Sequence, residues 1–121
     1  MRLLLDTQIM LWALTGSVRL GAAARGLIID PANDIYVSTA SIWEIAIKHA
    51  LGRGDMPVSG ERAAQLCAAA GYRELPVAWP HAVALETLPP LHADPFDRIL
   101  VAQAVAESMR LLSRDAAVAG Y

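Results

Sequence analysis

The sequence predicts an α/β domain built on a parallel sheet. One observation supports this fold class, and a second indicates the number of domains. Short apolar runs alternate with longer helical patterns along the chain, and this alternation is typical of α/β layering. The length of 121 residues suits one domain of ordinary size, and no internal repeat, low-complexity tract or linker divides it. We therefore expect a single domain over residues 1–121.

The first half of the chain contains two strand patterns with helical patterns after each. The run from Arg2 to Asp6 is leucine-rich, and DIYVST, from Asp34 to Thr39, is rich in β-branched residues. Pro31 and Asn33 predict a turn before the second strand. In order, we expect a strand over 2–6, helices over 8–14 and 21–30, a strand over 34–39, and a helix from Ser41 to the glycines of LGRG.

The second half repeats this alternation and ends on another strand pattern. Gly71 closes one helical pattern, and a Pro-Pro loop separates the next two. The expected elements are a helix over 60–70, a strand over 72–77, helices over 80–88 and 95–109, and a strand over 110–113. Because the helix after Asp94 is apolar almost all round, it is predicted to be buried in a core or an interface.

Composition restricts the class of function. The formal net charge is −2, with ten Lys and Arg against twelve Asp and Glu, which is unusual for a protein that binds polyanions without help. Either nucleic acid is not the ligand, or bound cations supply the missing positive charge. The hydrophobic content of 55% predicts that some apolar surface lies against another subunit or a partner.

The sequence carries signals for a reducing compartment and none for a membrane. The lone Cys67 cannot form an internal disulfide and is predicted to be a small buried hydrophobe. Asp6 and Gln8 interrupt the apolar run at the N-terminus, and no small-residue cleavage pattern follows. We expect a soluble cytoplasmic protein.

The stretch HADPFDRIL, which ends at Leu100, places two aspartates three residues apart at a helix start. One interpretation is structural: Asp94 caps the helix, Pro95 fills its first position, and the charge of Asp97 meets the helix dipole. The other interpretation is that Asp97 faces a metal ion. The positions of the other acids are needed to decide between them.

Four acids from distant segments are predicted to meet at one edge of the sheet. Asp6 ends the first strand, Glu44 lies one turn into the helix after the second, and Asp115 follows the last. Carboxyl ends of parallel strands share one edge, where ligands of open α/β sheets bind. Asp97 opens the helix that leads into the last strand, so its N-terminus is expected at the same edge.

Each acid also has a purely structural explanation. Asp6 with Thr7 caps the first helix, Asp115 caps a short terminal helix, and Glu44 completes a capping box with Ser41 and pairs with Lys48. Capping, however, does not require four acids at one edge, where like charges repel unless a cation holds them. Carboxylates without nearby Cys or paired His suit Mg²⁺ or Mn²⁺. The expected chemistry is phosphodiester cleavage by an activated water.

Four segments carry a resemblance to a known family. LLLDT at the start, SIWEIAIK in the middle, DPFDRILVAQA and LLSRD near the end resemble the PIN domains of VapC-type toxins, in the family's order and spacing. The resemblance covers nearly the whole chain. It implies a three-layer α/β/α sandwich with a central parallel sheet of about four to five strands. The family continues into a final edge strand after the fourth acid, and this strand is expected to be short or missing here.

The resemblance also assigns roles to residues. It implies that Asp6, Glu44, Asp97 and Asp115 are the catalytic, metal-binding acids, with Asp94 a cap more than a ligand. Thr7 and Ser113 stand where the family often places a hydroxyl near the metal or its waters. From their positions beside Asp97 and Asp115, Arg98 and Arg114 are candidates for phosphate contacts. The aromatic and histidine side chains, namely Trp12, Trp43, His49 and His81, are expected to serve core, surface or interface.

The function implied is a Mg²⁺- or Mn²⁺-dependent endoribonuclease of a toxin–antitoxin pair, leaving 5′-phosphate and 3′-hydroxyl ends. The resemblance implies a homodimer and a VapB-like antitoxin. The protein would bind DNA only indirectly, through this antitoxin. Two alternatives belong to other classes. A haloacid dehalogenase phosphatase requires a second Asp where this chain has Gln8. The other alternative is a PIN fold retained as a protein-binding module, which would bind metal weakly or not at all. The presence of all four acids argues against this alternative.

Overall fold

The computed structural model describes residues 1–52, 54–89 and 94–113 of the chain. Its described strands form one sheet in the order β3-β2-β1-β4, and every neighbouring pair is parallel. The strands are β1 (Arg2–Leu5), β2 (Asp34–Ser38), β3 (Arg73–Leu75) and β4 (Arg110–Leu112). The α/β class and the parallel sheet predicted from the sequence are therefore confirmed.

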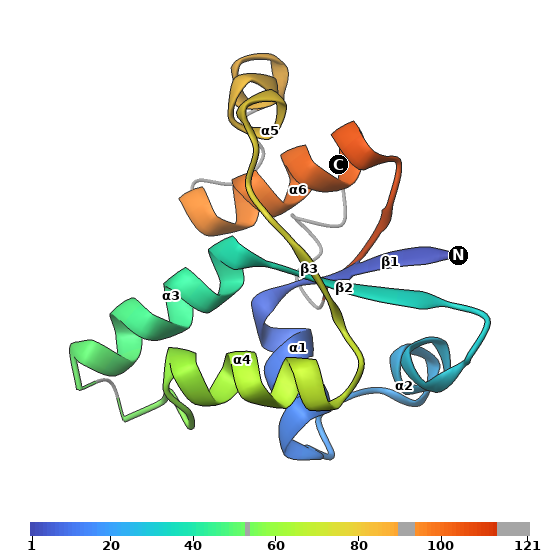
Figure 1. Ribbon diagram of the computed structural model, residues 1–121, viewed down its shortest axis with the longest axis vertical. Coiled ribbons are helices and arrows are strands. Elements are labelled where there is room, and N and C mark those ends of the chain that lie inside the picture. The colour runs from blue at the N-terminus through green and yellow to red at the C-terminus, as the bar shows by residue number, and fades with distance from the viewer. Residues whose placement is uncertain (53, 90–93, 114–121) are drawn as a thin grey trace.

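Helices cover both faces of this sheet. The α-helices of the described residues are α1 (Thr7–Thr15), α2 (Ala22–Ile29), α3 (Thr39–Ala50), α4 (Gly60–Ala69), α5 (Trp79–Ala84) and α6 (Pro95–Glu107), and a 3₁₀ turn, η1 (Leu85–Thr87), follows α5. Figure 1 shows α1 and α4 on one side of the strands and α5 and α6 on the other. This is the three-layer α/β/α arrangement. None of the described helices has the length and apolarity that a membrane span needs.

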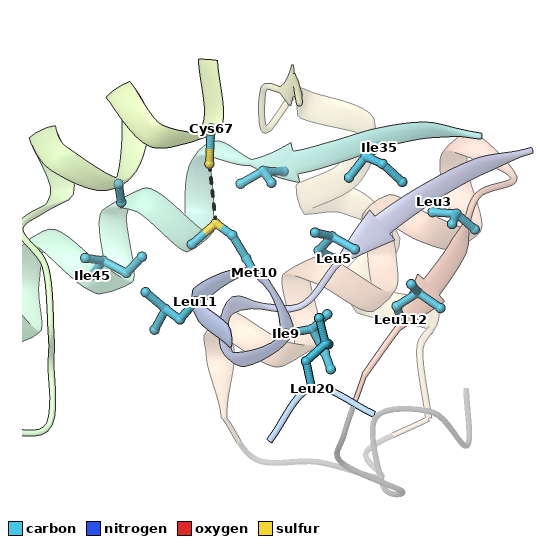
Figure 2. Packing of buried hydrophobic residues seen from close by; sticks show 12 residues of the cluster. Leu3, Leu5, Ile9, Met10, Leu11, Leu20, Ile35, Ile45, Cys67 and Leu112 are labelled. Atoms are coloured by element: carbon cyan, nitrogen blue, oxygen red, sulfur yellow. Dashed lines mark hydrogen bonds between the residues drawn. The ribbon is translucent and has the colours of Figure 1, made fainter. Parts of the chain in front are cut away.

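The core divides into two parts because side chains alternate across a strand. Leu3 and Leu5 of β1 pack in the larger cluster with α1, while Leu4 packs with α6 through Leu100. Figure 2 shows the larger cluster, in which side chains from β1, β2 and β4 meet those of α1. All three leucines of β1 are fully buried, so this strand is the centre of the fold.

One boundary is wrong in a way that matters for the site. The helix expected from Ser41 begins at Thr39, and its N-cap is Ser38, whose hydroxyl accepts a hydrogen bond from the backbone N–H of Ala40 at 3.0 Å. β2 runs into α3 without a loop, so the last residue of the strand is also the cap. Ser41 lies inside the helix, and the predicted capping box between Ser41 and Glu44 is wrong.

Two other elements are shorter than predicted. β3 ends at Leu75 because the next residue is Pro76, which has no N–H to give to the sheet. The helix expected over 80–88 ends at Ala84 and continues as η1. His81 of α5 is a core residue: it is buried, its Nδ1 accepts from the N–H of Ala78 at 2.9 Å, and its Nε2 lies 3.0 Å from a carboxylate oxygen of Glu107.

α6 starts as predicted and is only partly buried. It begins at Pro95, ends two residues earlier than expected, and is followed by Ser108 in the left-handed conformation with φ 54°. The middle of the helix is buried from Leu100 to Ala104, whereas Val105 is exposed. The prediction of burial is therefore confirmed for the middle of the helix, and an interface at the exposed Val105 stays a prediction.

Candidate active site

The site lies where strand order reverses. The chain adds β2 and then β3 on one side of β1, and β4 pairs with its other side. Open parallel sheets bind ligands at such a reversal, outside the carboxyl ends of the strands. Asp6 occupies this point: it follows β1 directly, and its backbone N–H donates to the carbonyl oxygen of Leu112, at the end of β4, at 3.0 Å. Ser113 follows Leu112 and therefore lies at the same edge.

The carboxylate of Asp6 caps α1. One side-chain oxygen, Oδ1, accepts from the backbone N–H of Ile9 at 2.7 Å, which confirms the structural interpretation of this residue. The residue is only 5% exposed. A carboxylate accepts several bonds, so capping leaves its ability to bind a cation intact. Asp6 is thus a charge held in a nearly buried position by the start of a helix.

Glu44 is fixed by protein groups on both of its oxygens. The hydroxyl of Thr7 lies 2.8 Å from Oε1, and Nζ of Lys48 lies 2.6 Å from Oε2. The Thr7 hydroxyl is also 3.0 Å from that of Ser41, which is almost fully buried. Thr7 has one proton to donate and the carboxylate can only accept, so when Thr7 donates to Glu44, Ser41 donates to Thr7. These residues connect the start of α1 with one face of α3.

The start of α6 supplies two further acids. Oδ1 of Asp94 accepts from the N–H groups of Phe96, at 2.8 Å, and Asp97, at 3.3 Å, so Asp94 is the N-cap as predicted. Asp97 stands in the first turn, where its charge meets the positive end of the helix dipole. Phe96 packs edge-on against Trp43, with ring centroids 5.3 Å apart, and this contact joins α6 to α3.

These acids surround one cavity, the polar hollow, of about 180 Å³. It brings together three of the four predicted metal-binding acids, namely Asp6, Glu44 and Asp97, together with Thr7 and Asp94. The described residues that line it are Asp6, Thr7, Gln8, Leu11, Glu44, Lys48, Asp55, Met56, Asp94 and Asp97. The strand order predicts these acids at the carboxyl edge, and Asp6, Glu44 and Asp97 do line one hollow there.

The polar hollow also contains residues that the sequence analysis did not select. Asp55 comes from the loop after α3, and Lys48 was considered only as the i, i+4 partner of Glu44. Asp55 follows the glycines that end α3, and this position after the helix carrying Glu44 was the one signal available in the sequence. The pairing of Lys48 with Glu44 is confirmed.

Other predicted site residues stand elsewhere or are not described. Asp115 and Arg114 lie outside the described residues. The guanidinium of Arg98 donates to the carbonyl oxygen of Leu85, in η1, at 3.5 Å, and Arg98 is not among the described residues lining the polar hollow. Its expected contact with phosphate stays a prediction.

The donor set suits a hard divalent cation. The polar hollow presents carboxylate oxygens, the ligands that Mg²⁺ and Mn²⁺ prefer, and its described lining contains no thiolate and no imidazole, the one sulfur there being the thioether of Met56. Within the described part of the chain, no three His, Cys, Asp or Glu side chains gather closely enough to hold an ion as they stand. The carboxylates border the hollow, and both oxygens of Glu44 are engaged by Thr7 and Lys48. By its chemistry, the set fits the ion that the sequence predicts.

Comparison with known proteins agrees with this architecture. The family model described as PIN domain matches residues 3–120. The fold is similar to that of VapBC2 from Rickettsia felis, solved bound to a DNA fragment from their promoter, with a TM-score of 0.67, 14% identity, and coverage of 95% of this chain and 88% of the other. It is also similar to FitAcB from Neisseria gonorrhoeae, with a TM-score of 0.66, 17% identity and coverage of 98% and 91%. No curated protein matches the chain in sequence.

Proposed function

The chain belongs to the PIN domain family, and on that premise we propose that it is a VapC-type toxin that hydrolyses RNA phosphodiester bonds with a divalent metal ion. One observation carries this proposal: Asp6, Glu44 and Asp97, from three separate segments, line a single polar hollow at the carboxyl edge of the sheet. Capping explains why Asp6 and Asp94 are acidic, but it gives no reason for these segments to bring their charges together.

The proposed metal ligands are Asp6, Glu44, Asp97 and Asp115, and the ion is Mg²⁺ or Mn²⁺. Such an ion supplies positive charge at the phosphate and makes a bound water acidic enough to act as nucleophile. It also supplies the positive charge that a chain of formal charge −2 lacks for binding RNA. No side chain needs to act as nucleophile, so the task of the protein is to place carboxylates and phosphate.

The residues of this chain hold that arrangement in three ways. The first turn of α1 fixes Asp6 through the N–H of Ile9, and the hydroxyl of Thr7 orients Glu44. The N-terminal end of α6 presents its dipole beside Asp97. Ser113 is proposed to contact the waters of the site, and Arg98 and Arg114 to contact RNA phosphates. Asp94 remains the cap of α6.

The proposed partners are a VapB-like antitoxin and a second copy of the chain. Exposed apolar side chains support a protein interface: Trp43 and Ile47 of α3 and its C-cap residue Leu51 follow one another at i, i+4 and i+8, and Trp79 at the start of α5 is 89% exposed. An apolar hollow of about 430 Å³ lies beside Trp43, between α3, η1 and α6. Surfaces of this kind mark protein contacts. DNA would be met only through the antitoxin, and the proposed location is the cytoplasm.

The direct test is cleavage of total RNA, with the ends of the products mapped. We expect cleavage with Mn²⁺ or Mg²⁺, none with chelator, and 5′-phosphate ends. Asp6→Asn and Asp97→Asn should abolish it, whereas Asp34→Asn, the same change at an exposed acid on the amino edge of β2, should not. Activity that survives chelation would refute the mechanism.

One observation favours a second candidate, a PIN fold that binds protein and holds metal weakly. The described carboxylates border the polar hollow without converging on one point. Titration with Mn²⁺ separates the two candidates. The enzyme should bind the ion with an affinity that Asp6→Asn weakens strongly, whereas the binding module should show weak affinity that the variant leaves unchanged.

The antitoxin is tested by co-expression with the neighbouring gene. We expect that gene to encode a short protein that co-purifies with the chain and stops RNA cleavage, by placing a basic side chain among the acids. A chain that is harmless when expressed alone would favour the binding module.

A further inference from the structure

The chain contains a single lysine. Of its ten basic residues nine are arginines, and the exception, Lys48, lies in the last turn of α3. Lys48 lines the polar hollow together with five carboxylates, those of Asp6, Glu44, Asp55, Asp94 and Asp97. It is the one basic side chain among the described residues of that lining. The only lysine of the protein therefore stands at its proposed active site.

Lys48 holds the carboxylate that the site needs. Its Nζ lies 2.6 Å from Oε2 of Glu44, while Thr7 takes Oε1 at 2.8 Å. The Lys48 side chain is 32% exposed and that of Glu44 is 9% exposed. Lys48 is therefore the more exposed partner of this pair, and both residues line the hollow. A cation bound at Oε2 would stand beside the Lys48 ammonium, and the repulsion between these two positive charges would displace Lys48.

An ordinary helix pair does not account for this placement. Pairs of Glu and Lys at i and i+4 on a helix surface stabilise the helix only slightly and need no particular surroundings. Here Glu44 is nearly buried and both side chains open onto a cavity lined by acids. A phosphate group entering that cavity meets a strong excess of negative charge. A movable positive charge beside the metal ligands reduces this repulsion.

Lysine suits such a role better than arginine does. An ammonium is a point charge on a flexible stem with three donors, so it can leave one oxygen acceptor and bind another. A guanidinium is planar and favours one fixed, two-point geometry. A side chain that binds two partners in succession needs the flexible, single-charge geometry of lysine.

We propose that Lys48 exchanges partners in the catalytic cycle. It holds Glu44 in the metal-free protein, and when a divalent cation takes Glu44, its ammonium contacts a phosphate oxygen of the RNA. The proposal rests on the proposed function, since it assigns a phosphate-binding residue to that site. No bond is made or broken by Lys48: the ammonium neutralises charge and positions the substrate.

The first experiment uses the fact that Lys48 is the only side-chain amine. Wild-type protein is acylated with an N-hydroxysuccinimide ester, and the modified peptides are quantified by mass spectrometry. With chelator, the pairing with Glu44 should make Lys48 slow to react, and Mn²⁺ should speed its acylation several-fold. The α-amino group of Met1, which donates to the carbonyl oxygen of Ala32, is the internal control and should react equally in both conditions. An acylation rate at Lys48 that is the same with chelator and with Mn²⁺ would overturn the proposed exchange of partners.

The second experiment measures the phosphate contact without relying on turnover. A labelled single-stranded RNA is bound in the presence of Ca²⁺, which takes oxygen ligands in looser geometry, and the RNA is checked to be intact afterwards. Lys48→Gln should weaken binding and lower the slope of log affinity against log salt by about 0.7, the value for one phosphate contact on a single strand. Arg110→Gln, at an exposed position on the amino edge of β4, should leave the slope unchanged. Lys48→Arg should keep the slope, because it keeps the charge.

The outcomes distinguish a failure of the proposed role of Lys48 from a failure of the proposed ribonuclease function. A wild-type protein that cleaves RNA while Lys48→Gln keeps the full salt slope overturns the role of Lys48 and leaves the ribonuclease standing. A wild-type protein that cleaves no RNA with any divalent ion overturns the proposed function itself. If Lys48→Gln fails to fold, as shown by its far-ultraviolet circular dichroism, the acylation of Lys48 in the wild type still decides, measured with Mn²⁺ for the exchange and with RNA and Ca²⁺ for the contact. The acylation rate of Lys48 should also be lower with RNA and Ca²⁺ than with Ca²⁺ alone. Equal rates in these two conditions would refute the contact between Lys48 and phosphate.

Discussion

Asp6 gives the sharpest test of the site, because its two roles separate under two substitutions. As the N-cap of α1 it needs only an oxygen 2.7 Å from the N–H of Ile9. Asparagine provides that oxygen and is as good a cap as aspartate, whereas alanine provides none. As a proposed metal ligand, however, Asp6 needs its charge. Asp6→Asn should therefore keep the stability of the protein and lose the metal, while Asp6→Ala should lower the stability and also lose the metal.

The magnitudes follow from the surroundings of Asp6. Asp6→Ala removes a cap, at a cost of roughly 0.5 to 2 kcal/mol, and leaves the N–H of the buried Ile9 without this acceptor, for a total of about 1 to 3 kcal/mol. At roughly 3 to 5 °C per kcal/mol for a domain of this size, the melting temperature should fall clearly. Asp6→Asn weakens the dipole interaction by about 0.3 to 1 kcal/mol and relieves repulsion among the acids, so its net effect with chelator should be small.

The assay is a set of melting curves for wild type, Asp6→Asn and Asp6→Ala, each with chelator and with Mn²⁺. At ten times its dissociation constant, Mn²⁺ should stabilise the wild type by roughly 1.4 kcal/mol and both variants much less. If Asp6→Asn melts as low as Asp6→Ala with chelator, the cap is not what Asp6 contributes to stability. If Asp6→Asn gains as much from Mn²⁺ as the wild type does, Asp6 is not a ligand.

Three further changes test other parts of the argument. If Asp97 only interacts with the helix dipole, Asp97→Asn should lower the free energy of unfolding by about 0.3 to 1 kcal/mol both with and without Mn²⁺. If Asp97 is a metal ligand, the variant should lose the stabilisation that Mn²⁺ gives the wild type; paired melting curves distinguish the two cases. Gly60→Ala should destabilise by about 1 to 3 kcal/mol in urea unfolding, because its Cβ would lie 2.9 Å from Cβ of Ala46, whereas Gly26→Ala, with open space, should not. Burial raises the pKa of the Cys67 thiol from 9.0 to about 11, so the unfolded chain ionises first and the free energy of unfolding should fall as pH rises from 9 to 11. Cys67→Ala should reduce that slope, and an unchanged slope would contradict the assignment.

The fold was predictable because its strongest signals are local. Three successive leucines before Asp6 predict a strand buried on both faces, and β1 is buried in this way at the centre of the sheet. The boundary of α3 was not predictable from pattern alone, since β2 passes into the helix with Ser38 as both strand end and cap. A pattern-based assignment expects a loop between two elements and so places the helix start too late.

The misassigned capping box shows how one spacing serves two structures. Ser41 and Glu44 are three residues apart, which suits a capping box at a helix start and equally places both side chains on one face within a helix. Inside α3, that face meets Thr7, and the hydroxyls of Ser41 and Thr7 lead to the Glu44 carboxylate. The spacing was informative, but only the position of the helix start decides which use it has.

The candidate site divides in the same way. Asp6, Glu44 and Asp97 could be placed together from the sequence because strand order and helix starts determine where the carboxyl edge lies. The role of Lys48 and the approach of Asp55 depend on how α3 and its following loop border the polar hollow. No motif encodes the path of that loop, since loop geometry depends on packing against elements distant in the sequence.

The question raised by HADPFDRIL, whether its acids are caps or ligands, separates what is seen from what is proposed. The described acids are held by local structure: Asp6 by the start of α1, Glu44 by Thr7 and Lys48, and Asp94 by the start of α6. Charges gathered around one hollow repel each other, and such bonds offset that repulsion while no ion is bound. A metal site works best when its ligands are already supported by neighbouring groups. Capping is then the means by which this fold keeps carboxylates at the edge of its sheet, which makes the structural role of an acid a condition for the proposed catalytic one.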